Sequence, residues 1–178
     1  MRIISGKYKG RRISAPKKLP VRPTTDMAKE GLFNVLNNDY YFDEFNVLDL
    51  FAGTGNMSYE FASRGTKHIT CVDKNTGCIG FINKTAKEFE MDLITIKSDV
   101  YSFLEKSKSK FNLIFADPPY GFPEEDFVKI VDLIFHNDLL EEDGIIIIEH
   151  SKHTILNTHT NFTKDRRYGG SVFSFFEQ

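Results

Sequence analysis

The hydrophobic positions along the chain predict strands and helices that alternate from residue 46 onward. Five short apolar runs have the length of strands, and between them apolar residues recur at helical spacing. Buried strands joined by helices are typical of a parallel sheet covered on both faces, so the pattern predicts an α/β fold. The predicted strands are 46–52, 68–73, 93–99, 111–117 and 144–150, and the predicted helices are 57–65, 76–91, 101–104 and 124–136.

Both ends of the chain depart from this alternation. Residues 1–23 hold two β-prone pieces and then three prolines, which predicts a basic β-hairpin followed by a linker. Residues 24–38 have helical spacing, and either Thr24 or Thr25 can cap that helix. Residues 161–178 predict an antiparallel hairpin at the edge of the sheet.

The composition is that of one globular domain spanning 1–178, which we divide into the hairpin and linker (1–23) and a catalytic core (24–178). No apolar stretch is long enough to span a membrane, and the N-terminus lacks the apolar core of a signal peptide. With two cysteines and five scattered histidines, we expect a cytoplasmic protein without disulfides and without a metal site.

The charges are distributed unevenly. Residues 1–29 carry nine Lys or Arg side chains and one acid, whereas the remaining 149 residues carry 14 basic and 24 acidic side chains. A basic arm on an acidic body indicates a polyanion bound at one edge of the molecule. The alternative is a solvated tail.

Aspartates end four of the predicted strands. The carboxyl ends of parallel strands lie at one edge of the sheet, where ligands of α/β proteins bind. Each aspartate alone could simply end a strand or cap a helix, but together they predict a ligand site. They are Asp49, Asp73, Asp99 and Asp117.

The glycine turn after the first strand favours one type of ligand. Residues 53–55 are Gly-Thr-Gly, but Ser58 stands where a dinucleotide-binding fingerprint has its third glycine. Asp73 is placed to accept hydrogen bonds from ribose hydroxyls, and Asp99 from an adenine amine, with the Val100 amide beside it. Ribose and adenine without pyrophosphate predict S-adenosylmethionine (SAM).

The stretch Asp117-Pro118-Pro119-Tyr120 follows the fourth of these strands. An exocyclic amine on a nucleobase is a poor nucleophile, so its methylation needs acceptors aimed at both N–H bonds. Asp117 can accept one and the Pro118 carbonyl the other, with the two prolines holding that carbonyl rigid. Tyr120 offers a stacking face for a flipped base. The stretch predicts methylation of an amino group on a base.

The chain resembles the RsmD-type 16S rRNA guanine-N2 methyltransferases over essentially all of its length. The resemblance implies a Rossmann-like SAM-dependent methyltransferase fold, with a seven-stranded, mostly parallel sheet whose last strand is antiparallel. The similar stretches are MRIISGKYKGRRI, VRPTTDMAKEGLFNVL, VLDLFAGTGNM, FNLIFADPPY and the late RRYGG.

The resemblance also implies roles for particular residues and, as target, guanine 966 of 16S rRNA. With the cofactor contacts derived above, the predicted SAM site is Thr24, Thr25, Asp49, Phe51, Gly53, Gly55, Asp73, Lys74, Asp99 and Val100. The implied rRNA contacts are Arg2, Lys7, Lys9, Arg11, Arg12 and Arg22. This sequence departs from the family at 56–59, which holds larger residues, and at Asp73, where the family often has Glu.

Other functions stay open at this point. The same pocket would support an adenine-N6 methyltransferase on RNA or DNA, and the basic arm would suit a SAM-binding RNA chaperone without catalysis. Cys71 and Cys78 are expected to be structural, which favours amine over ring-carbon methylation because the latter usually needs a thiol nucleophile. The expected partner is 16S rRNA or an assembly intermediate of the small subunit, bound by a monomer.

Overall fold

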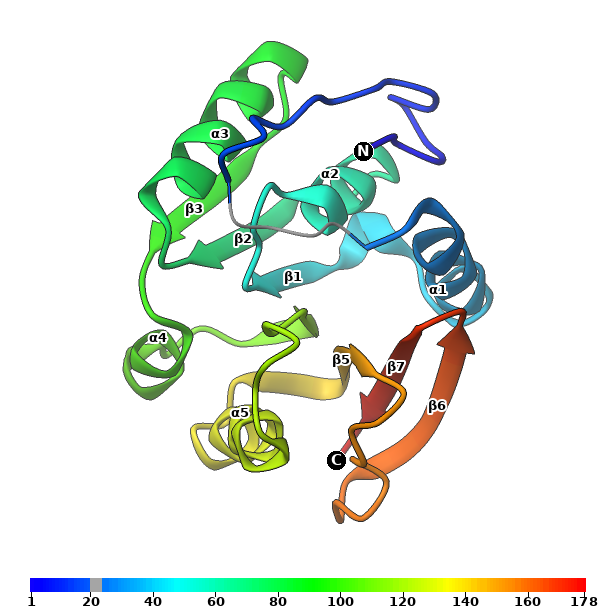
Figure 1. Cartoon of the computed structure of the whole chain (residues 1–178), viewed down its shortest axis with the longest axis vertical. Helices are drawn as coiled ribbons and strands as arrows, with labels where there is room; N and C mark the ends of the chain where they lie inside the picture. The colour runs from blue at the N-terminus through cyan, green and yellow to red at the C-terminus, as the bar shows by residue number, and fades with distance from the viewer. Residues whose placement is uncertain (20–23) are drawn as a thin grey trace.

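A computed structural model describes residues 1–19 and 24–178 (Figure 1). Seven strands form one sheet in the order β3-β2-β1-β4-β5-β7-β6. All strand pairs from β3 to β5 are parallel, and β7 runs antiparallel to both of its neighbours. The strands are β1 (Asn46–Leu50), β2 (His68–Asp73), β3 (Leu93–Lys97), β4 (Phe111–Ala116), β5 (Leu140–Ser151), β6 (Phe162–Tyr168) and β7 (Ser171–Phe176).

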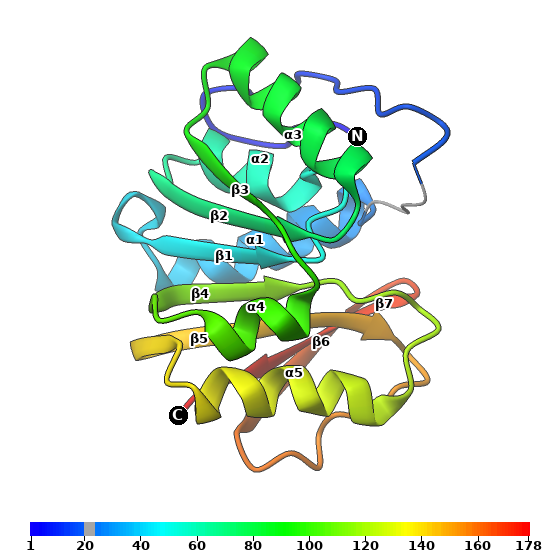
Figure 2. The same ribbon diagram turned by 90° about the vertical axis from the view of Figure 1, so that its left-hand side faces the viewer.

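Helices cover both faces of the sheet. One buried core joins one face to α1, α2 and α3, and a second core joins the other face to α4 and α5. Figure 2 shows α4 and α5 in front of the sheet, with α1 and α2 behind it. The helices are α1 (Asp26–Asp39), the short 3-10 helix η1 (Phe42–Glu44), α2 (Asn56–Ser63), α3 (Thr76–Phe89), α4 (Val100–Lys106) and α5 (Glu124–His136).

This architecture confirms the predicted Rossmann-like fold and the C-terminal edge hairpin. The main difference is that β5 begins at Leu140, four residues before the predicted start at Gly144. Leu140 pairs with Phe111 across an irregularity in the β4–β5 register. An interrupted ladder of this kind leaves no simple apolar alternation in the sequence. No described helix has the length and apolar character needed to cross a membrane.

The N-terminal arm, residues 1–13, folds back on itself as predicted but forms less regular structure than a hairpin of two strands. Its antiparallel pairing is one isolated bridge between Arg2 and Arg12, with the Ile3 amide donating to the Arg11 carbonyl at 3.0 Å. Ile3 and Ile13 are buried against the core, which anchors both halves of the arm.

Backbone hydrogen bonds fix the arm to α2. The amides of Ile4 and Ser5 donate to the Glu60 carboxylate at 2.8 and 3.0 Å, and the Lys7 amide donates to the Ser63 carbonyl at 2.7 Å. Gly6 has φ +81°, and a Cβ there would lie 1.8 Å from the Ser63 oxygen, so only glycine permits this approach. The arm is therefore docked, and its interpretation as a solvated tail is wrong.

The turn between β6 and β7 packs on α1. The Tyr168 ring lies against Gly31, where an added Cβ would come within 2.2 Å of it. The Tyr168 ring can lie this close to α1 because residue 31 is a glycine. The contact fixes the position of α1, the helix that follows Thr24.

Candidate active site

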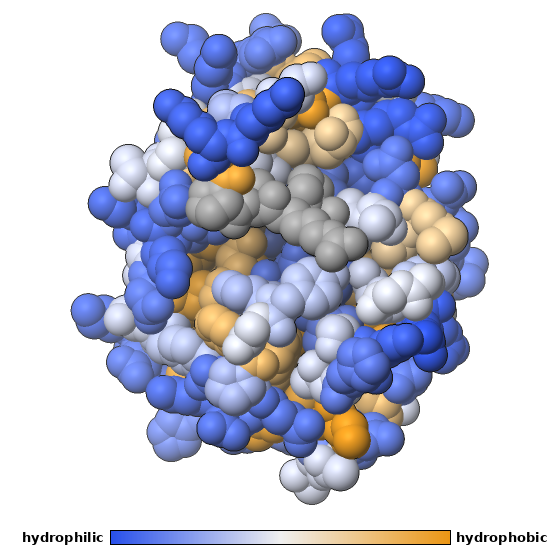
Figure 3. Space-filling view, in the orientation of Figure 1, coloured by the Kyte–Doolittle hydropathy of each residue, from blue (hydrophilic) through white to orange (hydrophobic). Residues whose placement is uncertain are grey.

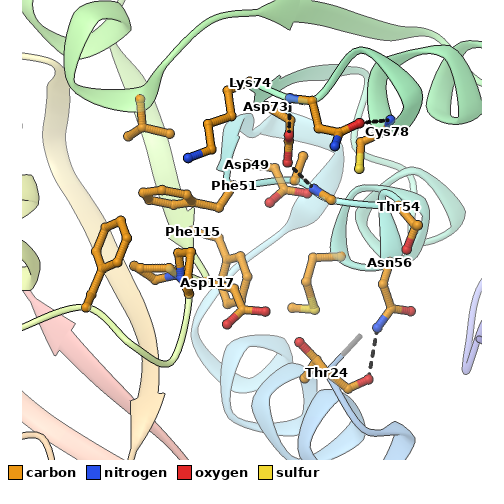
Figure 4. A pocket seen from close by; sticks show the side chains of 18 of the residues that line it. Thr24, Asp49, Phe51, Thr54, Asn56, Asp73, Lys74, Cys78, Phe115 and Asp117 are labelled. Carbon is orange, nitrogen blue, oxygen red and sulfur yellow. Dashed lines mark hydrogen bonds between the residues drawn. The ribbon is translucent and has the colours of Figure 1, made fainter. Parts of the chain in front are cut away.

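A cavity of about 350 Å³ opens at the carboxyl ends of β1, β2 and β4 and brings most of the predicted site residues together. Figure 3 shows apolar residues in a hollow on this face, with hydrophilic residues around it. Figure 4 shows Asp73 and Lys74 at one end of the cavity and Asp117 and Thr24 at the other. The predicted residues that line it are Thr24, Asp49, Phe51, Gly53, Asp73, Lys74, Asp99, Val100, Asp117, Pro118, Pro119 and Tyr120.

Two of the predicted cofactor residues, Thr25 and Gly55, are not part of this lining. Thr25 is the N-cap of α1, where its hydroxyl accepts from the Ala28 amide at 3.2 Å. Gly55 caps α2 with φ +81° and shapes the turn. Arg22 lies outside the described residues.

The turn after β1 has an unusual backbone and lines the cavity. Phe51 and Gly53 both have positive φ, at 58° and 55°. This conformation is rare for a residue with a side chain and is typical of functional sites. The Gly53 amide donates to the Asp73 carboxylate at 2.8 Å, which ties the turn to the end of β2.

Ser58, at the position of the third glycine of the dinucleotide fingerprint, has a role of its own in this site. Its hydroxyl donates to the Asp49 carboxylate at 2.5 Å, in a site where both side chains are buried. A glycine at this position would leave Asp49 without that donor. Ser58, which replaces the third glycine of the dinucleotide fingerprint, therefore holds Asp49 in place beneath the turn.

Asp73 and Asp99 have structural bonds as well as places in the cavity lining. Asp73 accepts from the amides of Gly53 and Asn75, and Asp99 caps α4 by accepting from the Ser102 amide at 3.1 Å. A carboxylate has about four acceptor positions, so both can also accept from a ligand. Ribose and adenine recognition by these residues stays a prediction.

The Asp117–Tyr120 stretch forms a rigid wall of the cavity. Pro118 is buried, Tyr120 is 51% exposed, and the Phe122 amide closes the turn by donating to the Pro119 carbonyl at 3.0 Å. Phe122 also lies edge-to-face with Phe51, with ring centroids 5.7 Å apart. Sequence analysis missed Phe122, because a single aromatic residue after a turn carries no distinctive signal.

The carboxyl groups at the closed end of the cavity have strongly perturbed acidities. Burial raises the pKa of Asp49 to about 7. Burial also raises the pKa of Asp117 well above its usual range, with the nearby charges of Glu149 and Asp49 adding to the effect. A raised pKa makes Asp117 a better proton acceptor than an ordinary carboxylate.

Glu149 is a buried acid beside the cavity that the sequence analysis did not find. It follows the four isoleucines of β5, is 2% exposed, and accepts a hydrogen bond from the Thr24 hydroxyl at 2.6 Å. Extending the rule of strand-end acids to the fifth strand would have identified it.

A buried polar network joins the arm to the rim of the cavity. Lys29 donates to the Arg2 carbonyl at 2.7 Å and to Asn56 at 2.9 Å, and its ammonium lies 3.4 Å from the Glu60 carboxylate. The Asn56 amide then donates to the Thr24 carbonyl at 3.0 Å. Lys29 is 1% exposed, so this one of the nine basic residues in 1–29 is an internal partner rather than part of a basic surface.

One of the two cysteines, Cys78, lines the cavity, whereas Cys71 lies within β2. Cys71 and Cys78 are free and buried, and burial raises the pKa of the Cys78 thiol to about 11 and that of Cys71 further. Neither thiol has the lowered pKa of a nucleophile. In the part of the chain that the structure describes, no group of His, Cys, Asp and Glu is arranged to hold a metal ion.

The fold and this cavity define a Rossmann-like methyltransferase. A family model described as "Conserved hypothetical protein 95" matches residues 1–177, and the chain belongs to this family, that of the RsmD-type rRNA methyltransferases. The chain is 38% identical to YlbH of Bacillus subtilis over 85% of its own length and 83% of that protein. It is 30% identical to Ribosomal RNA small subunit methyltransferase D of Haemophilus influenzae, over 92% of this chain and 85% of that one.

A solved structure supports the same assignment. The structure of yhhF from Escherichia coli superimposes with a TM-score of 0.83 at 26% identity, covering 99% of this chain and 96% of the other.

Proposed function

We propose that this protein transfers a methyl group from SAM to the N2 amine of a guanine in 16S rRNA. The observation that carries the proposal is the Asp117–Tyr120 wall, which places a partly buried carboxyl group with a raised pKa at one end of an acid-lined cavity. Relatives named as small-subunit rRNA methyltransferases support the choice of RNA.

The residues that line the cavity fit SAM. They include four aspartates and one lysine, a balance that suits a cationic nucleoside better than a pyrophosphate. Asp73 and Asp99 would accept from its ribose and adenine, and Thr24 and Asp49 would lie toward its methionine end. When bound, the cofactor supplies a methyl group activated by a positively charged sulfur.

Asp117 and the Pro118 carbonyl would each accept a hydrogen bond from one N–H group of the substrate amine. This arrangement directs the nitrogen lone pair toward the methyl group. A nitrogen–carbon bond forms, the carbon–sulfur bond breaks with its electrons going to sulfur, and the amine loses a proton. Asp117 holds that proton, and Tyr120 stacks on the base.

Guanine is favoured over adenine by family membership rather than by the pocket, since either amine fits the same pair of acceptors. Guanine 966 is the target implied for the family.

The decisive experiment uses small-subunit RNA and particles from cells that lack the protein. After incubation with the protein and labelled SAM, nucleoside mass spectrometry is expected to show N2-methylguanosine. Label in N6-methyladenosine would contradict the guanine assignment, and absence of label would contradict catalysis.

The arm makes a separate prediction about RNA affinity. Replacing the exposed Lys9, Arg11 and Arg12 by Gln should weaken RNA binding and lower the slope of log affinity against log salt by about 2, since each lost phosphate contact removes about 0.7–0.9 of a counterion. The slope can be measured by fluorescence anisotropy with an rRNA fragment.

A matched control removes the same charge from exposed lysines outside the arm. Lys67, Lys106 and Lys108 are exposed and lie before the amino ends of β2 and β4. Their replacement by Gln should leave the slope nearly unchanged. Equal slopes for the arm variant and the wild type would exclude the arm as an RNA contact.

A further inference from the structure

The C-terminal segment of the chain is a second basic region. Residues 151–178 carry four Lys or Arg side chains and two acids, whereas residues 30–150 carry ten basic and 22 acidic side chains. Three of the four basic side chains are exposed, those of Lys152, Arg166 and Arg167. Positive charge gathered on an otherwise acidic body indicates a polyanionic partner, as it does for the arm.

The C-terminal hairpin (β6 and β7) lies at the edge of the sheet where the active-site cavity opens. The pairing of β5 with β4 ends at Ile148 and Ala116, and β5 continues three residues further to Ser151, a distance of about 10 Å. In this extension His150 is opposite the β7 residue that pairs with Arg167. Figure 2 shows the turn of the hairpin at the same edge as the ends of β1 and β4.

A second cavity, of about 220 Å³, lies between the end of β5 and the C-terminal hairpin. Its charged side chains include two cations, Lys152 and Arg167, and one acid, Asp165. Thr154 and Asn157 add a hydroxyl and an amide to the lining. Cations together with neutral hydrogen-bond donors are the groups that bind a phosphate.

His150 contributes a fixed, uncharged ring to this cavity. Its Nδ1 lies 2.8 Å from the Ser151 carbonyl oxygen, its Nε2 lies 2.8 Å from the Ser174 hydroxyl, and the residue is 5% exposed. A carbonyl only accepts, so Nδ1 carries the proton and Nε2 accepts from Ser174. Burial lowers the pKa of His150, which keeps the ring neutral. The positive charge of the cavity therefore comes from Lys152 and Arg167.

The charges of Lys152 and Arg167 are not neutralised within the protein. None of the ion pairs among the residues that the structure describes involves either side chain. The Arg167 Nε donates to the Gly169 carbonyl at 3.2 Å, which fixes the guanidinium at the turn and leaves its two terminal nitrogens for a ligand. In the arm, by contrast, Arg2 is paired with Asp26.

A row of three aromatic rings connects this cavity with the active site. Phe122 lines the active-site cavity, and its ring centroid lies 6.1 Å from that of Phe127. The Phe127 centroid lies 6.3 Å from that of His150, which lines the second cavity. The second cavity is thus close to the Asp117–Tyr120 wall, where the target base is proposed to bind.

We propose that Lys152 and Arg167 bind phosphate groups of the RNA next to the methylated nucleotide, on the opposite side of the active-site cavity from the arm. This inference rests on the proposed function, because it assumes that an RNA base enters the active-site cavity. Figure 1 shows the arm and the C-terminal hairpin on opposite sides of β1. An RNA strand whose target base enters between them therefore has one flank near each basic surface.

The salt dependence of RNA binding tests this inference. For Lys152→Gln/Arg167→Gln, the slope of log affinity against log salt should fall by about 1.5, since each lost phosphate contact removes about 0.7–0.9 of a counterion. Combination with the three arm substitutions should lower it by about 3.5 in total, because the two surfaces contact different phosphates. Lys106→Gln/Lys108→Gln removes two exposed charges before β4 and should leave the slope nearly unchanged. Fluorescence anisotropy with an rRNA fragment measures all four slopes.

Asp165→Asn should have the opposite effect on affinity. It removes the acid that lines the same cavity as the two cations, and it should raise RNA affinity by about two- to fivefold, the effect of one exposed charge pair. A purely structural role of the C-terminal hairpin would not produce this gain.

Shortened RNA fragments test the placement of the two surfaces. Once the methylated nucleotide has been mapped, the fragment is cut back on its 5′ side or on its 3′ side. The effect of Lys152→Gln/Arg167→Gln should disappear with one of these fragments, and the effect of the arm substitutions with the other.

Three results would overturn the inference while leaving the proposed function intact. The first is a wild-type slope in a Lys152→Gln/Arg167→Gln variant that circular dichroism shows to be folded. The second is loss of both effects with the same shortened fragment. The third is normal RNA binding by that variant with loss of methylation of assembled particles, which would assign the surface to a ribosomal protein. Absence of RNA binding by the wild type at every salt concentration would contradict both.

Discussion

Asp117→Asn should lower the rate constant for methyl transfer by about 100- to 1,000-fold, which corresponds to about 3–4 kcal/mol of lost transition-state stabilisation. The amide is the same size as the carboxylate, but it is neutral and cannot take the proton that the amine releases. Because Asp117 also lines the cavity, SAM affinity should fall too, by no more than about tenfold. The rate is measured in single turnovers with saturating SAM and rRNA.

The matched control is Glu125→Gln, an acid of α5 that is exposed and outside the cavity. It should retain the wild-type rate and SAM affinity. A folded Asp117→Asn variant with the wild-type rate would rule out the proposed amine pocket. If that variant also kept the biological activity of the protein, the non-catalytic RNA chaperone would become the better explanation.

Local patterns predicted the fold well because each element carries its own signal. The β-branched run of β5, the period of α5 and the turn residues that separate the elements all report on neighbours in the sequence. The aspartates at the strand ends predicted the edge of the sheet at which the cavity opens, because the topology of a parallel sheet brings the carboxyl ends of its strands together.

Hydrogen bonds and ion pairs between residues far apart in the sequence could not be predicted from local patterns. Thr24 and Glu149 are 125 residues apart, and nothing in either local sequence indicates that they share a hydrogen bond. The same holds for Lys29, which in the sequence is one more basic residue near the arm. Its burial depends on two other segments, the arm with Arg2 and α2 with Asn56 and Glu60.

These pairs change the interpretation of the arm. Sequence composition treats it as a charged attachment, whereas the structure bonds it to α2 and, through Lys29 and Asn56, to the carbonyl of Thr24 at the cavity rim. A segment proposed to bind RNA and a segment proposed to hold the cofactor are therefore parts of one buried network. Disturbing its centre should affect both.

Lys29→Met is expected to lower the free energy of unfolding by about 3 kcal/mol, near the low end of the range for removing one partner of a buried ion pair. Glu60 would keep the Arg64 guanidinium at 2.9 Å and the two arm amides, which limits the loss, but Asn56 and the Arg2 carbonyl would lose their shared donor. Urea unfolding measures the change, and Lys87→Met on the exposed surface of α3 should stay within about 0.5 kcal/mol of the wild type.

Adding Glu60→Gln to Lys29→Met separates the ion pair from the rest of the network. The side chain introduced by Glu60→Gln carries no charge and can accept from one of the two arm amides. The double variant should lose less stability than the sum of the two single variants, with a coupling of about 1–3 kcal/mol. Strict additivity would mean that Lys29 stabilises the protein through packing and its two neutral acceptors alone. In that case the arm and the cavity would be joined by hydrogen bonds without a contribution from the buried charge of Glu60.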